Sequence, residues 1–248
     1  MVKIVLNSRF EHLRQYIEEI PGQMESRGDV MESGRNLIKQ DHVAGIHLVI
    51  KSYRRIYFPN KIRYSYFYPS KAQRAYDYAQ VLIANGFNTP APIAYIEVRE
   101  NSLIQSSFFI CEYTNLTTLT AVVQGKVDPP SDLMVELARF TYSLHLKHLY
   151  HIDYSVGNIL YKQSEGRIDF ALIDNNRMKF GPVSFKEGIR NLVRLGLPVS
   201  QLTLLAEEYT RLRNVNVYVG LACFFRYKRA DVLRRENKHK LKKFFGRA

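Results

Sequence analysis

The stretch HIDYSVGNILY, residues 151–161, decides the fold. Asn158 follows Asp153 by five residues, and two β-like runs then lead to Asp174 at the end of an apolar strand. This order of groups is that of a kinase active site. Phosphoryl transfer needs a carboxylate that orients and deprotonates the acceptor hydroxyl, and oxygen ligands that hold Mg²⁺ against the nucleotide phosphates. We therefore predict Asp153 and His151 as catalytic residues, and Asn158 and Asp174 as metal ligands.

The flanking sequence favours this interpretation over a chance match. A short Asp and Asn pattern also occurs in loops whose side chains bond to the backbone. Here a helix that Ser131 can cap precedes the loop, and its apolar face is formed by Leu133, Leu137, Phe140 and Leu144. The β-like runs at 159–161 and 168–174, joined by a turn at 163–166, follow the loop.

A lysine upstream completes the pattern. The β-branched run 45–51 predicts a buried strand that ends on Lys51, and a helix is predicted over about 71–85, between Ser70 as N-cap and Asn85-Gly86 as stop. In a kinase this lysine reaches the α- and β-phosphates and is steadied by a carboxylate from the following helix. The candidate carboxylate is Asp77, one methylene shorter than the usual Glu. The alternative is a plain charge at the end of a surface strand.

The expected phosphate-covering loop, residues 31–36, is poor in glycine. It contains Gly34 alone, where kinases of the common type have three glycines. Arg35 can supplement the backbone donors. We therefore include Gly34 and Arg35 in the predicted nucleotide site.

Three strings resemble the bacterial lipopolysaccharide kinase family: residues 70–97, 151–161 and 172–180. Members of that family phosphorylate Kdo or heptose sugars of the lipid A core. The resemblance covers about residues 30–215 and implies a bilobal protein-kinase-like fold, ATP with Mg²⁺, and work at the cytoplasmic face of the inner membrane.

The family roles transfer to Lys51, Asp153, Asn158 and Asp174, and to Asp77 with less support. The chain departs from protein kinases at residues 174–177, where Asp-Asn-Asn-Arg replaces Asp-Phe-Gly. The Phe and Gly of a typical activation switch are therefore missing. Glu112 and Tyr113 end the strand-like run 108–113, where the family chain crosses between lobes, and their backbone groups are expected at the adenine edge. A plain strand end is an equally good interpretation of these two residues.

These observations predict an α+β, bilobal protein-kinase-like fold. Residues 1–112 would form a small lobe of antiparallel sheet and one helix that binds the nucleotide phosphates. Residues 113–248 would form a mainly helical lobe with the catalytic loop and the metal site. The predicted reaction is ATP-dependent phosphorylation of a Kdo or heptose hydroxyl on a lipid A precursor.

Two alternatives stay open. The chain could phosphorylate a soluble small molecule, such as an aminoglycoside or a sugar. It could also be a catalytically weak nucleotide-binding protein with a regulatory function, given the short Asp77 and the single-glycine loop.

Composition excludes several other classes. The 248 residues are 46% hydrophobic and 24% charged, as in ordinary folded proteins. Two cysteines cannot build a disulfide scaffold, which favours a reducing compartment. The N-terminal apolar run is too short for a secretion signal. The longest apolar stretch, 217–225, is about half of the ~20 residues that span a bilayer.

Charge is concentrated at the C-terminus. The net charge is +13, and residues 226–248 hold ten Lys and Arg against Asp231 and Glu236, which leaves +8 there. No zinc, helix-turn-helix or RNA-binding signature accompanies this charge, so we expect no nucleic-acid partner. An anionic membrane surface fits better, with Phe244 and Phe245 entering the interface. The alternative is a solvated or packed C-terminal helix.

Overall fold

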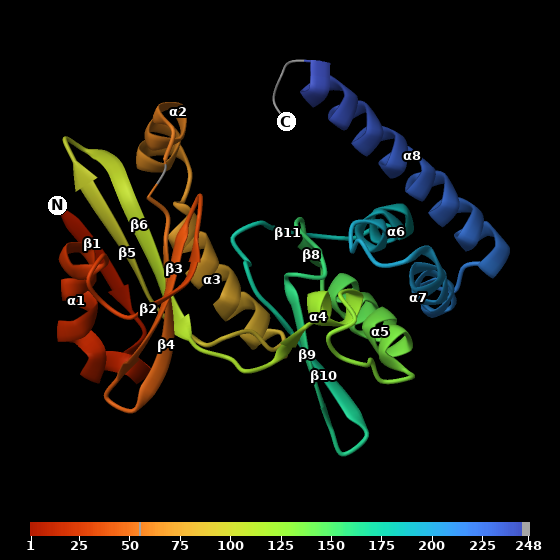
Figure 1. Cartoon of the computed structure of the whole chain (residues 1–248), viewed down its shortest axis with the longest axis horizontal. Coiled ribbons are helices and arrows are strands. Elements are labelled where there is room, and N and C mark those ends of the chain that lie inside the picture. The colour runs from red at the N-terminus through yellow and green to blue at the C-terminus, as the bar shows by residue number, and fades with distance from the viewer. Residues whose placement is uncertain (55, 245–248) are drawn as a thin grey trace. The chain divides into compact units, whose positions relative to one another are not determined.

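A six-stranded antiparallel sheet organises the first half of the chain (Figure 1). The structure is a computed structural model that describes residues 1–54 and 56–244. The strand order is β1-β5-β6-β4-β3-β2. The strands are β1 (Val2–Leu6), β2 (Asp29–Ser33), β3 (Leu37–Val43), β4 (Ile46–Ser52), β5 (Pro92–Glu100) and β6 (Leu103–Glu112). Because β4 lies inside the sheet, Lys51 near its end has a fixed backbone position.

Helices cover both faces of this sheet (Figure 1). Successive side chains of a strand point to opposite faces. Accordingly, Ala94 and Ile96 of β5 pack in the cluster with α1, whereas Tyr95 packs with α3. The helical elements here are η1 (Ser8–Leu13), α1 (Arg14–Gln23), α2 (Phe58–Ile62), the π-helix η2 (Arg63–Phe67) and α3 (Lys71–Ala84). The expected helix at 71–85 is confirmed as α3, and the others were not predicted.

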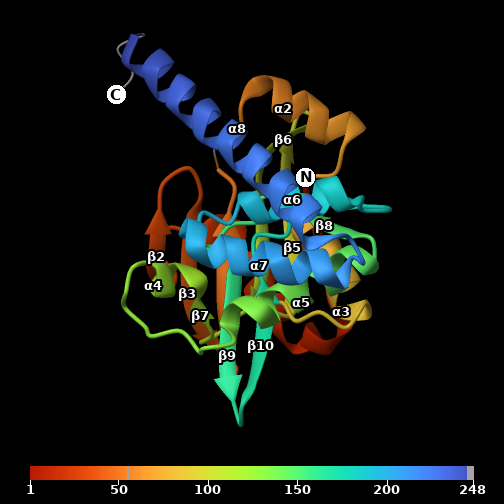
Figure 2. The ribbon, with the colours of Figure 1, turned by 90° about the vertical axis from the view of Figure 1, so that its right-hand side faces the viewer.

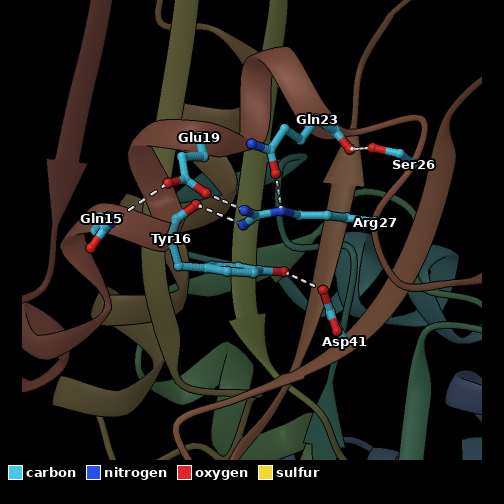
Figure 3. Close-up of polar contacts among 7 residues, drawn as sticks. All are labelled: Gln15, Tyr16, Glu19, Gln23, Ser26, Arg27 and Asp41. Carbon is cyan, nitrogen blue, oxygen red and sulfur yellow. Dashed lines mark hydrogen bonds and ion pairs between the residues drawn. The ribbon is translucent and has the colours of Figure 1, made fainter.

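A polar cluster ties α1 to the hairpin β2–β3 (Figure 3). Arg27 donates to Gln23 Oε1 at 2.7 Å and to Glu19, and its guanidinium lies over the Tyr16 ring at 4.4 Å. The Tyr16 hydroxyl donates to Asp41 Oδ2 of β3 at 2.7 Å, and its pKa is raised mainly by burial. These bonds hold the base of the hairpin whose turn carries Gly34 and Arg35.

The second half of the chain is mainly helical. Its helices are α4 (Leu119–Val123), α5 (Leu133–Leu146), α6 (Phe185–Val193), α7 (Val199–Leu212) and α8 (Val217–Phe244). Short strands form a sheet of β7 (Thr117–Thr118), β9 (Ile159–Ser164) and β10 (Arg167–Leu172), and a pair of β8 (Leu149–His151) and β11 (Met178–Phe180). The apolar face predicted for α5 is confirmed, but Asp132 and not Ser131 occupies its N-cap position.

Helix α8 contacts α6 and α7, as Figure 2 shows. Gly220 of α8 allows close approach, because a Cβ there would lie 2.2 Å from Thr210 Cγ2. Phe224 is fully buried, and Asp231 is buried about two turns further along. The basic C-terminal segment is therefore part of a helix whose first half is packed. Within the described residues, no helix has the length and apolar character needed to cross a membrane.

Internal contacts divide the chain into two units. The first consists of residues 1–115 and 171–177, and the second of 116–170 and 178–248. The predicted α+β fold, with an antiparallel sheet followed by a mainly helical part, is confirmed. The assignment of separate functions to residues 1–112 and 113–248 stays a prediction.

Candidate active site

Lys51 forms an ion pair with Asp174 inside the first unit. Its Nζ lies 2.6 Å from Asp174 Oδ1, and the two side chains are 15% and 33% exposed. Asn176 Nδ2 donates to the same carboxylate oxygen at 2.5 Å. The fold thus brings together two side chains that lie 123 positions apart in the sequence. They are the lysine predicted to bind phosphates and the carboxylate predicted to bind the metal.

The segment that carries Asp174 is anchored to the loop before β5. Leu172 donates its N–H to the Asn88 carbonyl at 3.0 Å, and Asn175 Nδ2 donates to Thr89 Oγ1 at 2.8 Å. Asp174 itself has a φ of 57°, in the left-handed region that few residues other than glycine adopt. Its neighbours therefore hold the carboxylate in a conformation that costs about 1 kcal/mol or more.

The structure does not bring Asp77 to Lys51. No salt bridge joins the two in the described chain, and the charged neighbour of Asp77 is Lys3 of β1. The sheet order explains this, because β5 and β6 separate β1 from β4, and α3 packs on β5 and β6. Burial is the main cause that raises the pKa of Asp77.

Sequence reasoning missed Lys71, the first residue of α3. Lys71 and Lys51 both lie 5.7 Å from the centre of the buried Tyr53 ring. Burial, followed by repulsion from Arg35, lowers the pKa of Lys71. Lys71, Arg35 and Tyr53 line a pocket of about 380 Å³ together with Asn60. The only sequence signal for Lys71 was its place directly after the N-cap of the helix that follows the strand lysine.

The remaining predicted nucleotide residues lie in the β2–β3 turn and at the end of β6. Gly34 begins the β2–β3 turn, and its N–H donates to the Asn36 carbonyl at 3.0 Å. Glu112 donates its backbone N–H to Ala91, and Tyr113 donates to His47, each at 2.9 Å. Both of these N–H groups are therefore engaged within the protein. An adenine amino group is a donor and would contact a backbone carbonyl oxygen.

The Asp153 loop of the second unit is held by its backbone carbonyls. The carbonyls of three successive residues each accept a side-chain donor: His151 from Asn191 at 3.0 Å, Ile152 from Arg194, and Asp153 from Asn158 at 2.9 Å. Asn158 thereby closes a ring within the predicted motif. Because its Nδ2 is used in this bond, its oxygen is the amide atom left for a cation.

His151 is placed inside the protein. Its side chain is 1% exposed, and its ring lies 6.2 Å from that of Tyr154, which is equally buried and shares a hydrogen bond of 2.8 Å with Thr141. The His151 side chain is therefore part of the interior of the second unit. The catalytic role predicted for His151 stays a prediction.

Asn191 is itself oriented by a buried histidine. His145 Nε2 lies 3.2 Å from Asn191 Oδ1, and His145 Nδ1 lies 2.8 Å from the Tyr209 hydroxyl. Burial lowers the pKa of His145 to about 4. The ring is thus neutral near pH 7 and links α5, α6 and α7 behind the catalytic loop.

Acidification should destabilise the chain through His145. Between its unfolded pKa of 6.5 and its folded pKa of about 4, the unfolded state binds the proton and the folded state does not. The free energy of unfolding therefore falls as the pH is lowered through this window, by about 3 kcal/mol in full. Urea unfolding at pH 7 and pH 4.5 should show a smaller pH effect in His145→Gln, which keeps one donor and one acceptor. Equal pH effects in both proteins would refute this role.

Comparison with known proteins identifies relatives of this arrangement. The family model described as "Lipopolysaccharide kinase (Kdo/WaaP) family" matches residues 23–215. No curated protein gives a match. A solved structure titled "WaaP in complex with acyl carrier protein" is 18% identical, with a TM-score of 0.64, and the match covers 92% of this chain and 98% of that one.

A second solved structure shows the same fold at greater distance. It is the Rio2 kinase of Chaetomium thermophilum in an ADP/Mg²⁺-phosphoaspartate complex, 13% identical with a TM-score of 0.50, and the match covers 94% of this chain and 78% of that one. At these identities the two structures establish the protein-kinase-like fold, whereas the family model spans most of the chain. The chain therefore belongs to the lipopolysaccharide kinase (Kdo/WaaP) family and is a phosphotransferase.

Proposed function

We propose that the chain transfers the γ-phosphoryl group of ATP to a hydroxyl of Kdo or heptose in the inner core of lipopolysaccharide, on a lipid A precursor. The observation that carries this proposal is the Lys51–Asp174 ion pair, which joins the phosphate-binding lysine to the predicted metal-binding carboxylate. Family membership supports a sugar of lipopolysaccharide as the acceptor.

The donor set fits Mg²⁺ bound together with nucleotide. Asp174 Oδ1 accepts from Lys51 and Asn176, which leaves Oδ2 for a cation, and the Asn158 amide presents its oxygen. The described residues contain no group of three or more His, Cys, Asp or Glu side chains that could hold a metal ion. Proteins usually bind Mg²⁺ through one or two carboxylates plus phosphates and water, and Asp174 provides one such carboxylate. When bound, Mg-ATP supplies the phosphoryl group and neutralises its charge.

Three cations of the first unit bind the nucleotide phosphates in this proposal. Lys51 is held by Asp174, and Lys71 and Arg35 line the neighbouring pocket. Backbone donors are few in a turn with Gly34 alone, so side-chain cations take over part of the phosphate binding. Asp153 accepts the proton of the acceptor hydroxyl, and the bonded carbonyls of its loop limit how far its backbone can move.

A transfer assay tests the proposal. The chain is incubated with labelled ATP, Mg²⁺ and a panel of Kdo-containing and heptose-containing lipid A precursors, with an aminoglycoside and free sugars as competing acceptors. Mass spectrometry then locates the phosphate. Transfer to the aminoglycoside alone would favour the small-molecule alternative, and nucleotide binding without transfer to any acceptor would favour the regulatory one.

We further propose that the chain works at the cytoplasmic face of the inner membrane, held there by the basic part of α8. Residues from Arg234 to Leu241 are exposed and include four Lys and Arg. The side chain of Phe244, and Phe245 as a whole, lie outside the described residues. Attraction of basic side chains to anionic lipid is worth about 1 kcal/mol each near the surface.

Removal of residues 237–248 should weaken binding to anionic vesicles and spare activity on a soluble sugar. This cut removes five Lys and Arg but keeps the packed part of α8, including Asp231. A cut after Phe225 would also remove packed residues and confuse docking with folding. The loss should shrink as salt is raised, because screening acts over ~8 Å at physiological ionic strength. Vesicle sedimentation measures it, and equal binding by the shortened and intact chains would argue against docking.

A further inference from the structure

A depression in the second unit is lined by positive charge. It has a volume of about 400 Å³ and lies where β8, β11, α6 and α8 meet. Its lining includes two tyrosines and four cations: Tyr150, Tyr227, Lys179, Arg190, Arg194 and Arg234. We refer to these six residues as the basic depression.

The acidic groups nearby do not neutralise this charge. Asp231 also lines the basic depression, but it is shared by Arg234 and by Arg235, whose Nε lies 2.7 Å from Asp231 Oδ2. Glu187 is exposed and accepts bonds from the Ser184 hydroxyl at 2.7 Å and the Ser184 N–H at 3.0 Å. Lys179 and Arg190 lower the pKa of Glu187 at longer range, after these bonds. An uncompensated positive charge therefore remains.

Aromatic rings hold the two cations that have no carboxylate partner. The Arg190 guanidinium lies 4.5 Å from the centre of the Tyr227 ring, and Lys179 Nζ lies 5.9 Å from that of Tyr150. Among the described residues, neither cation forms a salt bridge. Stacking on a ring orients a guanidinium without using its N–H donors, which stay available for a two-pronged contact with a carboxylate or phosphate.

The basic depression adjoins the catalytic loop. Ile152 lines it and precedes Asp153, and Arg194 donates to the Ile152 carbonyl. An anion held here would thus be bound beside the residue that deprotonates the acceptor. The cations assigned to the nucleotide phosphates, Lys51, Lys71 and Arg35, all belong to the first unit. The position in the second unit favours the acceptor over the nucleotide as the source of the anion.

We propose that the basic depression binds an acidic group, carboxylate or phosphate, of the acceptor saccharide, and so selects an anionic acceptor over a neutral one. This inference rests on the proposed function, because it assigns the anion to the sugar that is phosphorylated. Arg190 is the central residue, since its donors are free of carboxylates and its plane is set by Tyr227.

Calorimetric titration of the full chain tests binding without any transfer step. The probes are Kdo, which carries a carboxylate, glucosamine 1-phosphate, which carries a phosphate, and the neutral methyl ester of Kdo. At least one acidic probe should bind, and Arg190→Gln should weaken its binding by about 10- to 100-fold. Arg190→Lys should be intermediate, because it keeps the charge and loses the planar fork. The methyl ester should bind weakly and equally to all variants.

Two further variants guard against a folding artefact. Arg234→Gln, at an exposed position late in α8, should also weaken the acidic probe, and Arg229→Gln, on the same helix outside the basic depression, should not. In transfer assays, Arg190→Gln should raise the acceptor KM about tenfold and leave kcat within about twofold.

The outcomes separate the two proposals. Failure of both acidic probes to bind the unaltered chain, or equal affinity in Arg190→Gln, would overturn the basic depression as an anion site. Absence of transfer to every sugar, with anion binding that still depends on Arg190, would overturn the proposed function instead.

Discussion

Asp153→Asn is expected to slow turnover by about 10²- to 10⁴-fold, because an amide cannot take the proton of the acceptor hydroxyl. The backbone of the loop should be unaffected, since the carbonyls of residues 151–153 keep their donors from Asn191, Arg194 and Asn158. The affinity for Mg-ATP should therefore stay the same. Steady-state kinetics and calorimetric titration with Mg-ATP measure the two quantities separately.

Asp169→Asn is the matched control for this change. Asp169 is an exposed aspartate of β10 outside the catalytic loop. The same loss of one negative charge should leave turnover unchanged there. Full activity of a folded Asp153→Asn protein would remove Asp153 from the mechanism.

Asp174→Asn is expected to abolish metal-dependent nucleotide binding, with a loss of about 100-fold or more in affinity for Mg-ATP. A hard cation loses its anionic oxygen ligand, and Lys51 loses its ion pair. Asn is the better substitution for the test, because it tolerates the left-handed φ of 57° at this position, whereas Ala adds strain. Calorimetric titration with ATP in the presence of Mg²⁺ and of EDTA measures the metal-dependent part.

The titration with EDTA serves as the internal control for Asp174→Asn. Metal-free ATP should bind this variant about as well as it binds the unaltered chain, since Lys71 and Arg35 remain in their pocket. If Mg²⁺ still strengthens nucleotide binding to the variant, the metal is held by other residues and the assignment of Asp174 is wrong.

Elements with local signals were predictable from the sequence. Ser70 predicted the start of α3, and its hydroxyl accepts the Gln73 N–H at 3.1 Å. The β-branched run ending at Lys51 became β4, and the turn before Arg167 joined β9 to β10. The signal in each case lies within a few residues of the element, where capping and alternation act.

Elements that depend on distant partners were missed. Strand β1 is short and exists through pairing with β5, where Ile4 lies opposite Ile96. Helix α1 contains Pro21, which removes a helical hydrogen bond, and it is held by burial of Ile17 and Ile20 against the sheet. Contacts between segments that are distant in the sequence produce little signal in the local pattern of residue types.

The residues of the candidate site also differ in how far local sequence predicts them. Residue types and spacing predicted Lys51 and Asp174 as site residues, and the structure joins the two in an ion pair. The partner of Lys51 was assigned to Asp77 from the usual helix position, yet the strand order places that helix beside Lys3. The role of Lys71 depends on the ring of Tyr53 beneath it, which no spacing rule encodes.

The return of residues 171–177 to the first unit has a consequence for the nascent polypeptide. Residues 1–115 are synthesised first. Residues 116–170 must follow before Asp174, whose carboxylate pairs with Lys51, is added to the chain. Closing so long a loop is entropically costly, and it makes this contact late in folding. A chain stalled before residue 171 would expose Lys51 without its partner and would lack the predicted metal ligand. Competence to bind Mg-nucleotide is therefore expected to appear only after Asp174 has been synthesised, whatever the order in which the sheet itself assembles.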